Sequence, residues 1–194
     1  MSNETIGILT SLDKNNINTK LALHGSPVIA GVKNANLMVV DRKYLMAIRK
    51  MFKDTPVRVF VLCFNGDTVS VLLYRKEETE SYLKQDRVAK TLFKLGCKFS
   101  DLQSLLWSIK KEYTDYCLGL GKFPHQLGLL LGYPPEDVEG FIENEGQGYK
   151  LNGYWKVYFD EENARKKFSI FDETRERAIK MVKVNRSLLE LMPS

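Results

Sequence analysis

Two runs of β-branched, aromatic and other apolar residues flank an Asn-Gly pair in the first half of the chain. Residues 57–64 read VRVFVLCF, residues 68–74 read TVSVLLY, and Asn65-Gly66 begins the short connection between them. Asn and Gly tolerate the positive φ angles of a tight hairpin turn, so the pattern predicts a β-hairpin over residues 57–74. The first strand is apolar at nearly every position, which predicts burial on both faces under a layer of helices.

Other runs along the chain predict two more strands and several helices. The stretches NLMVV at residues 36–40 and GYWKVYF at residues 153–159 are strand candidates. An S-x-x-Q capping box at residues 100–103 precedes an apolar stripe at helical spacing, and a long final helix is expected from Glu161 to about Leu188. These elements predict an α+β fold in which a small, mainly antiparallel sheet is covered by several helices.

The distribution of polar residues predicts how the chain is divided. The first 16 residues are rich in Asn, Ser and Thr, and we expect them to form a flexible N-terminal arm. Residues 17–194 contain no repeat, linker or low-complexity segment, so we expect them to form a single globular domain. A chain of 194 residues can bury a sizeable core without a disulfide or a metal.

Composition excludes several classes of protein. Hydrophobic residues make up 44% and charged residues 27%, the proportions of an ordinary globular protein. No apolar run approaches the ~18 residues of a membrane-spanning helix, and no secretory signal is readable. The 3 cysteines are an odd number without C-x-x-C spacing, which favours free thiols in a reducing compartment. We therefore expect a cytoplasmic protein without a membrane partner; the sequence indicates no oligomeric state.

The placement of charge argues against nucleic acid as the main partner. The formal net charge is +5, and the basic excess lies in the first half of the chain. Residues 133–162 hold 2 basic and 8 acidic residues, a block of net charge −6. Such a block repels phosphates, whereas nucleic-acid binding usually needs a concentrated basic face with aromatic or polar readers.

Two segments are richer in Gly, Pro and polar side chains than packing alone requires. The first is HGSPVIAGVKNANL at residues 24–37, which contains His24, Lys33 and Asn36. The second covers residues 123–158, where Gly, Pro and aromatic residues are dense. Loops of this kind carry binding and catalytic side chains more often than regular core does. We expect the two segments to lie side by side in the fold.

The 2 histidines, His24 and His125, are the remaining candidates for chemistry. A zinc site needs three or four nitrogen, sulfur or oxygen ligands, and none of the usual close spacings is present, so no metal is expected. Imidazole titrates near neutral pH, which makes either histidine a candidate general acid or base. No recognisable motif indicates a cofactor.

Two motifs carry a resemblance to a known family. His24, Pro27, Gly31 and Lys33 form an H-x-x-P-x-x-x-G-x-K pattern, and LGYPPEDVEGFI is followed by GYWKVY. On these residues the chain resembles the bacterial family called domain of unknown function 3793. The resemblance implies a cytoplasmic domain from anaerobic Gram-positive bacteria without an assigned activity. The resemblance implies Glu after the second His, where this chain has Gln126. Without that acid, a catalytic base or a metal site at this position is less favoured.

These features favour a groove for a small anionic or planar ligand, formed by residues 24–37 and 123–158. The candidate binding residues are His24, Lys33, Asn36, His125, Tyr133, Lys150, Tyr154, Trp155 and Lys156. One alternative is an enzyme that uses His125 or His24 as general acid or base. Another is a protein or nucleic-acid interaction module, and a third is that the glycines and prolines only shape turns around core aromatics. A cleft that joins both histidines to a carboxylate favours catalysis, whereas cations and aromatics without an acid favour binding.

Overall fold

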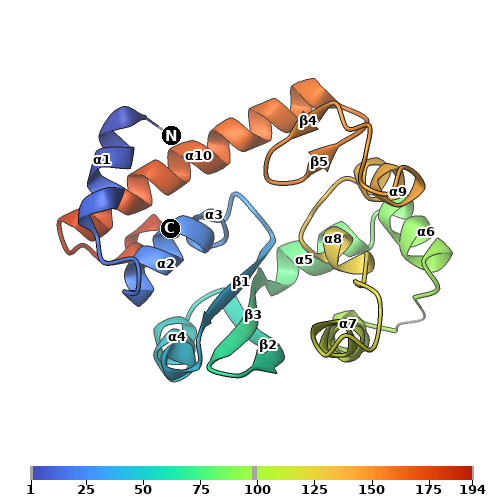
Figure 1. The fold of residues 1–194 in the computed structure, drawn as a ribbon, viewed down its shortest axis with the longest axis horizontal. Helices are drawn as coiled ribbons and strands as arrows, with labels where there is room; N and C mark the ends of the chain where they lie inside the picture. Colours follow the sequence, from blue (N-terminus) through green and yellow to red (C-terminus); the bar gives the residue numbers. More distant parts are fainter. Residues whose placement is uncertain (1, 98–99, 194) are drawn as a thin grey trace.

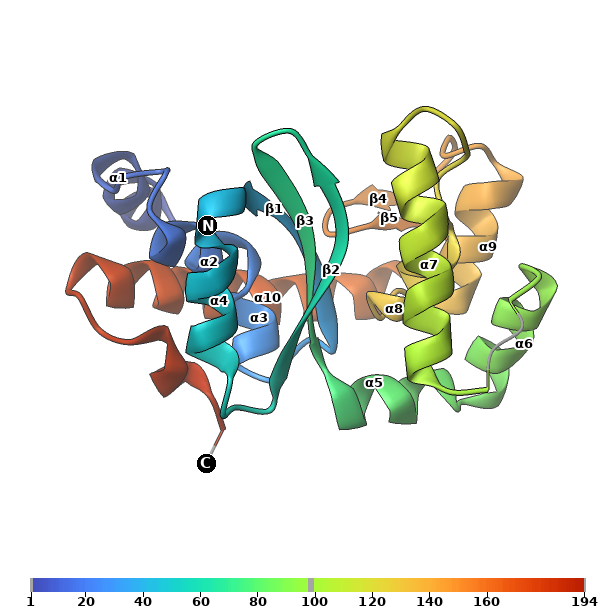
Figure 2. The ribbon, with the colours of Figure 1, turned by 90° about the horizontal axis from the view of Figure 1, so that it is seen from below.

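The computed structural model describes residues 2–97 and 100–193 and confirms the α+β prediction. A three-stranded antiparallel sheet lies between two groups of helices, with α10 running along both groups (Figures 1 and 2). The strands of this sheet are β1 (Ala35–Asp41), β2 (Val57–Asn65) and β3 (Thr68–Arg75). The helices are α1 (Asn3–Ser11), α2 (Ile17–His24), α3 (Ser26–Ile29), α4 (Leu45–Phe52), α5 (Lys76–Leu83), α6 (Asp86–Lys94), α7 (Leu102–Cys117), α8 (Gln126–Leu130), α9 (Pro135–Glu143) and α10 (Glu161–Lys183), with 3-10 turns at Arg42–Tyr44 and Leu188–Leu191.

The predicted hairpin and the strand near residues 36–40 are both present. β2 and β3 pair around the turn, where Gly66 has a φ of 53°, and β1 pairs with the other edge of β3. The central strand is therefore β3, which is buried at nearly every position, whereas Arg58 and Phe64 of β2 are exposed. β2 is therefore an edge strand. The prediction that it is buried on both faces holds for its middle, where Val61 and Leu62 face the two cores, and not for its ends.

Alternation along the strands gives the sheet a hydrophobic core on each face. Val61 and Val71 pack with α2, α3, α4 and α10 on one face. Leu62 and Leu72, one residue further along, pack with α7 and its neighbours on the other face. Successive side chains of a strand point to opposite faces, so two apolar faces require two layers of helices.

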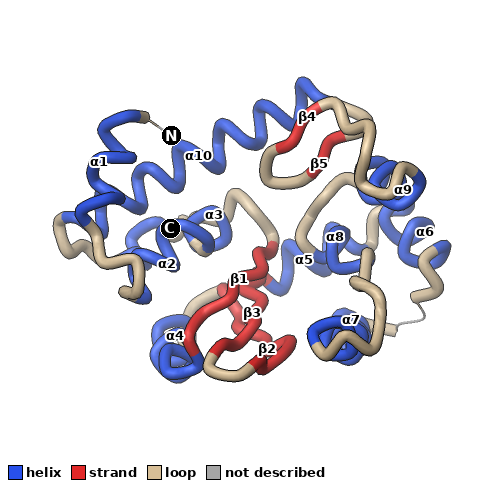
Figure 3. The backbone as a smooth tube through the Cα atoms, viewed as in Figure 1, coloured by secondary structure: helices blue, strands red, loops and turns tan. Residues whose placement is uncertain are grey.

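The strand predicted near residues 153–159 does not join the central sheet. It is replaced by β4 (Leu151–Asn152) and β5 (Lys156–Val157), which form a separate small hairpin, drawn in red beside α9 in Figure 3. Gly153 begins the turn, and a Cβ placed on it would lie 2.2 Å from the Phe168 ring of α10. The missing side chain therefore lets the turn pack directly on α10.

The N-terminal residues form a docked helix instead of the expected flexible arm. Ser2 caps α1 by accepting a hydrogen bond from the Thr5 amide, and α1 packs against α10. The hydroxyls of Ser2 and Thr5 donate to the Glu176 carboxylate at 3.0 and 3.2 Å. Local polarity indicated a loose arm, but these polar groups have a partner 171 or more residues away.

Helix ends also differ in detail from the prediction. The cap of α7 is Asp101, whose carboxylate accepts from the Ser104 amide, instead of Ser100. The final helix ends at Lys183 and not near Leu188. Within the described ranges, no helix combines enough length and apolarity to cross a bilayer.

Candidate functional site

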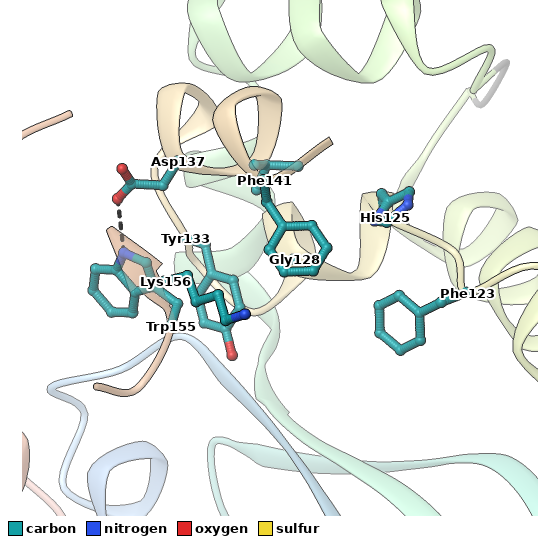
Figure 4. Close-up of a pocket in the computed structure, with 9 residues that line it drawn as sticks. Phe123, His125, Gly128, Tyr133, Asp137, Phe141, Trp155 and Lys156 are labelled. Atoms are coloured by element: carbon teal, nitrogen blue, oxygen red, sulfur yellow. Dashed lines mark hydrogen bonds between the residues drawn. The ribbon is translucent and has the colours of Figure 1, made fainter. Parts of the chain in front are cut away.

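An aromatic pocket of about 190 Å³ lies where α8 and α9 meet the β4–β5 hairpin (Figure 4). Tyr133, Trp155 and Lys156 are at one end, and Phe123 and His125 are at the other. Aromatic side chains supply most of the wall, and the lining consists of Phe123, His125, Gly128, Tyr133, Asp137, Val138, Phe141, Trp155 and Lys156. Every lining residue comes from the second of the two segments that the sequence singled out.

Gly and Pro set the backbone around the pocket. Pro135 occupies the first turn of α9, where its missing N–H costs no hydrogen bond. A Cβ on Gly128 would lie 3.1 Å from Val138 and 3.3 Å from the Tyr133 ring, so glycine allows α8 to pack closely against α9. Gly132 ends α8 with a φ of 81°, a conformation that favours glycine. The two helices are thereby packed closely against each other across a short turn.

Asp137 fixes the β4–β5 hairpin to α9. Its side chain is buried, and Oδ2 accepts a hydrogen bond from the Trp155 indole at 2.7 Å. Oδ1 accepts from the amides of Tyr158 and Phe159 at 2.8 and 3.0 Å. A buried carboxylate is stable only when its oxygens are well bonded, and here both are. Asp137 therefore positions the indole that walls the pocket, and both of its oxygens are occupied by donors of the hairpin.

His125 is enclosed mainly by aromatic rings. Its ring centroid lies 6.0 Å from that of Phe123 and 5.7 Å from that of Phe141. Burial lowers the pKa of His125 below its ordinary value, so the imidazole is neutral at pH 7. In the described part of the chain, no residue forms a hydrogen bond with this ring. A neutral imidazole offers a ligand one donor and one acceptor.

Lys156 supplies a cation at the pocket. Its Nζ donates to the carbonyl of Gly146 at 2.7 Å and lies 4.9 Å from the Tyr149 ring and 5.7 Å from the Phe141 ring. An ammonium group has three N–H donors, so two remain for a bound molecule. This end of the pocket therefore favours an anionic group.

Lys33 brings the first segment against the wall of the pocket. The side chain is 6% exposed, and its Nζ lies 5.5 Å from the Tyr133 ring centroid and 5.9 Å from that of Phe171. Tyr133 in turn stacks on Trp155 with centroids 5.2 Å apart. The first segment thus contacts the second at Tyr133, although it contributes no lining residue.

A chain of hydrogen bonds holds Lys33 in place. Its Nζ donates to Oδ1 of Asn36 at 2.6 Å, and Nδ2 of Asn36 donates to the carbonyl of His24 at 2.6 Å. Three of the residues predicted from the sequence are therefore adjacent. His24 takes part through its backbone, while burial and the charges of Arg175 and Lys20 lower the pKa of its imidazole.

A comparison with models of protein families identifies the family of this chain. A family model described as Protein of unknown function (DUF3793) matches residues 21–192. The chain belongs to this family. Comparison with curated proteins and with solved structures gives no significant match. The part shared with the DUF3793 family includes the aromatic pocket, Lys33 and α10, and it begins after α1.

Other predicted site residues of this DUF3793 protein lie away from the pocket. Lys150 is exposed, and its Nζ donates to the carbonyl of Phe159 at 2.9 Å. Tyr154 packs on Phe171 of α10 and is not in the lining. Gln126 is buried and donates to the Glu112 carboxylate at 2.6 Å. Its amide therefore has a structural partner.

Arg175 is the residue that the sequence did not single out. It is one of several basic residues on α10, a helix whose charges indicate a solvated face with salt bridges. Its guanidinium lies 4.8 Å from the Tyr154 ring and 3.5 Å from Asp172, and its Nε is buried without a hydrogen-bond partner. α10 packs against α2 and α3, and the charge of Arg175 contributes to the lowered pKa of both His24 and Lys33. Among the described residues, no group of three His, Cys, Asp or Glu side chains could hold a metal ion.

The buried ammonium of Lys33 makes stability depend on pH. Burial, and then the charge of Arg175, lowers the pKa of Lys33 to about 7, whereas an unfolded lysine has a pKa of about 10.4. Between these two pKa values Lys33 carries a proton in the unfolded chain that it lacks in the folded chain. The free energy of unfolding should therefore increase with pH between about 7 and 9. Lys33→Met should remove this increase, as measured by urea unfolding at pH 7 and pH 8.5.

The control for this measurement is Lys166→Met, because Lys166 is 70% exposed on α10. The wild type, Lys33→Met and Lys166→Met have the same tyrosines and cysteines. The contributions of these residues to the pH dependence of the unfolding free energy therefore cancel when the three proteins are compared. If Lys33→Met kept the same dependence on pH as Lys166→Met, the folded protein would hold Lys33 as a charged ammonium throughout this range.

Proposed function

We propose that the protein binds a small planar anion, about one ring in size, in the aromatic pocket. The observation that carries the proposal is the lining: aromatic walls, a neutral imidazole, and one ammonium group with free N–H donors. Pockets for small molecules are typically apolar with a few polar groups that fix orientation. The described lining has this composition.

Size restricts the ligand to a single ring. The cavity is about 190 Å³, and an apolar cavity of about 150 Å³ is known to hold benzene. Tyr133 and Trp155 form a stacked pair on the wall, and Phe141 lies between them and His125. Aromatic rings prefer offset or edge-on contacts with other rings, which suits a planar molecule inserted among these side chains.

Charge favours an anion over a neutral molecule or a cation. The acid in the described lining is Asp137, whose two oxygens already accept three hydrogen bonds. Lys156 therefore contributes the uncompensated charge. A carboxylate on the ligand would form a charge-assisted hydrogen bond with its Nζ, which is stronger than a neutral one.

The arrangement supports binding better than acid–base catalysis. Catalysis by either histidine is favoured when both converge with a carboxylate in one cleft. His24 is not in the described lining, and Asp137 is committed to the hairpin. His125 alone can hydrogen-bond a ligand without a partner that orients it for proton transfer.

The proposal predicts tight discrimination between benzoate and benzamide, which have the same shape but differ in charge. Benzoate titrated into the protein should shift the indole resonance of Trp155 in NMR spectra, with benzamide bound more weakly. Lys156→Met should weaken benzoate about tenfold, or ~1.4 kcal/mol, and leave benzamide unchanged.

Lys150→Met is the matched control, because Lys150 lies on the same hairpin segment but donates to the Phe159 carbonyl outside the pocket. It should leave benzoate binding unchanged. The absence of any shift at millimolar benzoate, or equal weakening by the two lysine variants, would contradict the proposed site.

A further inference from the structure

We infer that the ligand of the aromatic pocket carries a hydrogen-bonding group opposite its anionic group, so that Lys156 binds one end of the molecule and His125 binds the other. A ring with a carboxylate and a hydroxyl at opposite positions is the simplest member of this class. The inference rests on the proposed function, because it specifies the ligand of the same pocket. It is supported by the places of the polar side chains in the lining, by the ring that Lys156 and His125 share as a neighbour, and by the elements that hold the two residues apart.

The polar side chains of the described lining fall into two groups (Figure 4). Tyr133 and Lys156 lie at one end of the pocket, and His125 lies at the other. The indole of Trp155 and the carboxylate of Asp137 are bonded to each other, and amides of the hairpin occupy the second carboxylate oxygen. The rest of the described lining is apolar. A ligand can therefore form polar contacts at its two ends and apolar contacts along its length.

Lys156 and His125 are both neighbours of the Phe141 ring. The centroid of this ring lies 5.7 Å from Nζ of Lys156 and 5.7 Å from the imidazole centroid of His125. Figure 4 shows Phe141 between these two side chains. A planar ring packed against Phe141 would direct one substituent toward the ammonium group and the opposite substituent toward the imidazole. Two substituents at adjacent ring positions would both lie at one end and leave the other end without a partner.

His125 has the hydrogen-bonding capacity that its end of the pocket requires. In the described part of the chain, no residue bonds to its ring nitrogens, and neither nitrogen is a buried atom without a partner. Both nitrogens are therefore open to a ligand or to water. Burial lowers the pKa of this imidazole, so the ring is neutral at pH 7, with one donor and one acceptor. A hydroxyl group donates and accepts, so it fits either nitrogen.

A second depression lies on the other side of His125. It has a volume of about 310 Å³, shares Phe123 and His125 with the aromatic pocket, and is lined further by polar side chains that include Glu112 and Lys122. His125 thus lies between an apolar pocket and a polar surface. One ring nitrogen can bond to a ligand while the other is hydrated, so binding leaves no polar atom of this ring without a partner.

The packing of α8, α9 and the β4–β5 hairpin fixes the distance between the two ends of the pocket. His125 is held at the start of α8, where its carbonyl accepts from the Gly128 amide at 2.9 Å. Gly128 allows α8 to pack closely on α9, and Asp137 of α9 holds the hairpin that carries Lys156. Because these contacts set the length of the pocket, the pocket selects a ligand by the separation of its polar ends.

The test compares benzoates that differ at the position opposite the carboxylate. 4-Hydroxybenzoate and 4-methylbenzoate have similar sizes, but the methyl group cannot form the hydrogen bond. Isothermal titration calorimetry at pH 7 should show that 4-hydroxybenzoate binds about tenfold more tightly than 4-methylbenzoate, as expected for one neutral hydrogen bond. 3-Hydroxybenzoate should lose most of this advantage, because its hydroxyl does not point along the axis from Lys156 to His125.

His125→Phe separates the hydrogen bond from the shape of the wall, because it keeps an aromatic ring beside Phe123 and Phe141. The ratio of the two dissociation constants should fall from about ten to about one, whatever happens to each affinity. Lys156→Met should weaken both acids by a similar factor and keep the ratio. In the wild type, the imidazole nitrogen resonances of His125 should move further with 4-hydroxybenzoate than with 4-methylbenzoate, and the other histidine, His24, is the internal reference.

The outcomes distinguish this inference from the proposed function. Equal affinities of the wild type for the hydroxyl and methyl acids, or a preference that persists in His125→Phe, would overturn the role of His125 while benzoate binding at Lys156 remained. If neither benzoate nor 4-hydroxybenzoate bound at millimolar concentration, the proposed function itself would be contradicted, and this inference with it.

Discussion

Asp137→Ala is expected to destabilise the protein by about 3–5 kcal/mol and to release the β4–β5 hairpin from α9. The alanine leaves three donors without an acceptor: the Trp155 indole and the amides of Tyr158 and Phe159. A buried donor that loses its acceptor costs about 1–3 kcal/mol, and removal of a buried charge offsets part of the total. Urea unfolding followed by tryptophan fluorescence measures the change.

Asp137→Asn tests whether the geometry or the charge of this side chain matters. Its amide oxygen can still accept from the two backbone amides, but its NH₂ group would face the indole N–H of Trp155. We therefore expect Asp137→Asn to lower the free energy of unfolding, but by less than Asp137→Ala does. A loss below ~1 kcal/mol in Asp137→Ala would show that these hydrogen bonds do not hold the hairpin.

The role of Asp137 could not be predicted from the sequence. Acidic residues in the first turn of a helix are favoured by the helix dipole, and that local reason is sufficient to explain Asp137. Its actual partners are 18 to 22 residues further along the chain. Pairing at that separation depends on how the hairpin turns back at Gly153, which is a property of the packing against α10.

The fold was predictable where the signal is local. The hairpin was found because the turn residues and both strands lie within 20 residues, and β1 was found from its apolar run. Which strand is central could not be found in this way, because β2 and β3 are both apolar. β3 is central because β1 pairs with its free edge, for example Asn36 with Leu73, and these residues are distant in the chain.

The arrangement of the candidate site was predictable only in part for the same reason. Residue types indicated aromatic and cationic groups among Gly and Pro, and the structure places Lys33 beside Tyr133, 100 positions away. It does not place Lys150 there, because that side chain bonds to the nearby Phe159 carbonyl. Arg175 could not be distinguished from the other basic residues of α10, since its position depends on which face of a long helix meets α2 and α3.

Val61→Asp is expected to abolish folding at neutral pH. Val61 is 7% exposed in β2, opposite Val71 of the central strand, within the core that α4 and α10 cover. An aspartate there buries a charge without a partner, a cost of several kcal/mol. Total stabilities are about 5–15 kcal/mol, so this cost removes most or all of the folding free energy. Circular dichroism should show loss of the cooperative thermal transition.

Val39→Asp is the matched control, because Val39 lies on the neighbouring strand β1 and is 54% exposed. The same chemical change in the same sheet should then cost less than about 1 kcal/mol, since a solvated carboxylate keeps its hydration. In the wild type, amides of β3, which pairs with a strand on each side, should exchange slowly, as expected of the strand with the highest local stability. A cooperative transition in Val61→Asp at the wild-type temperature, or rapid exchange throughout β3, would show that the core is not centred on β2 and β3.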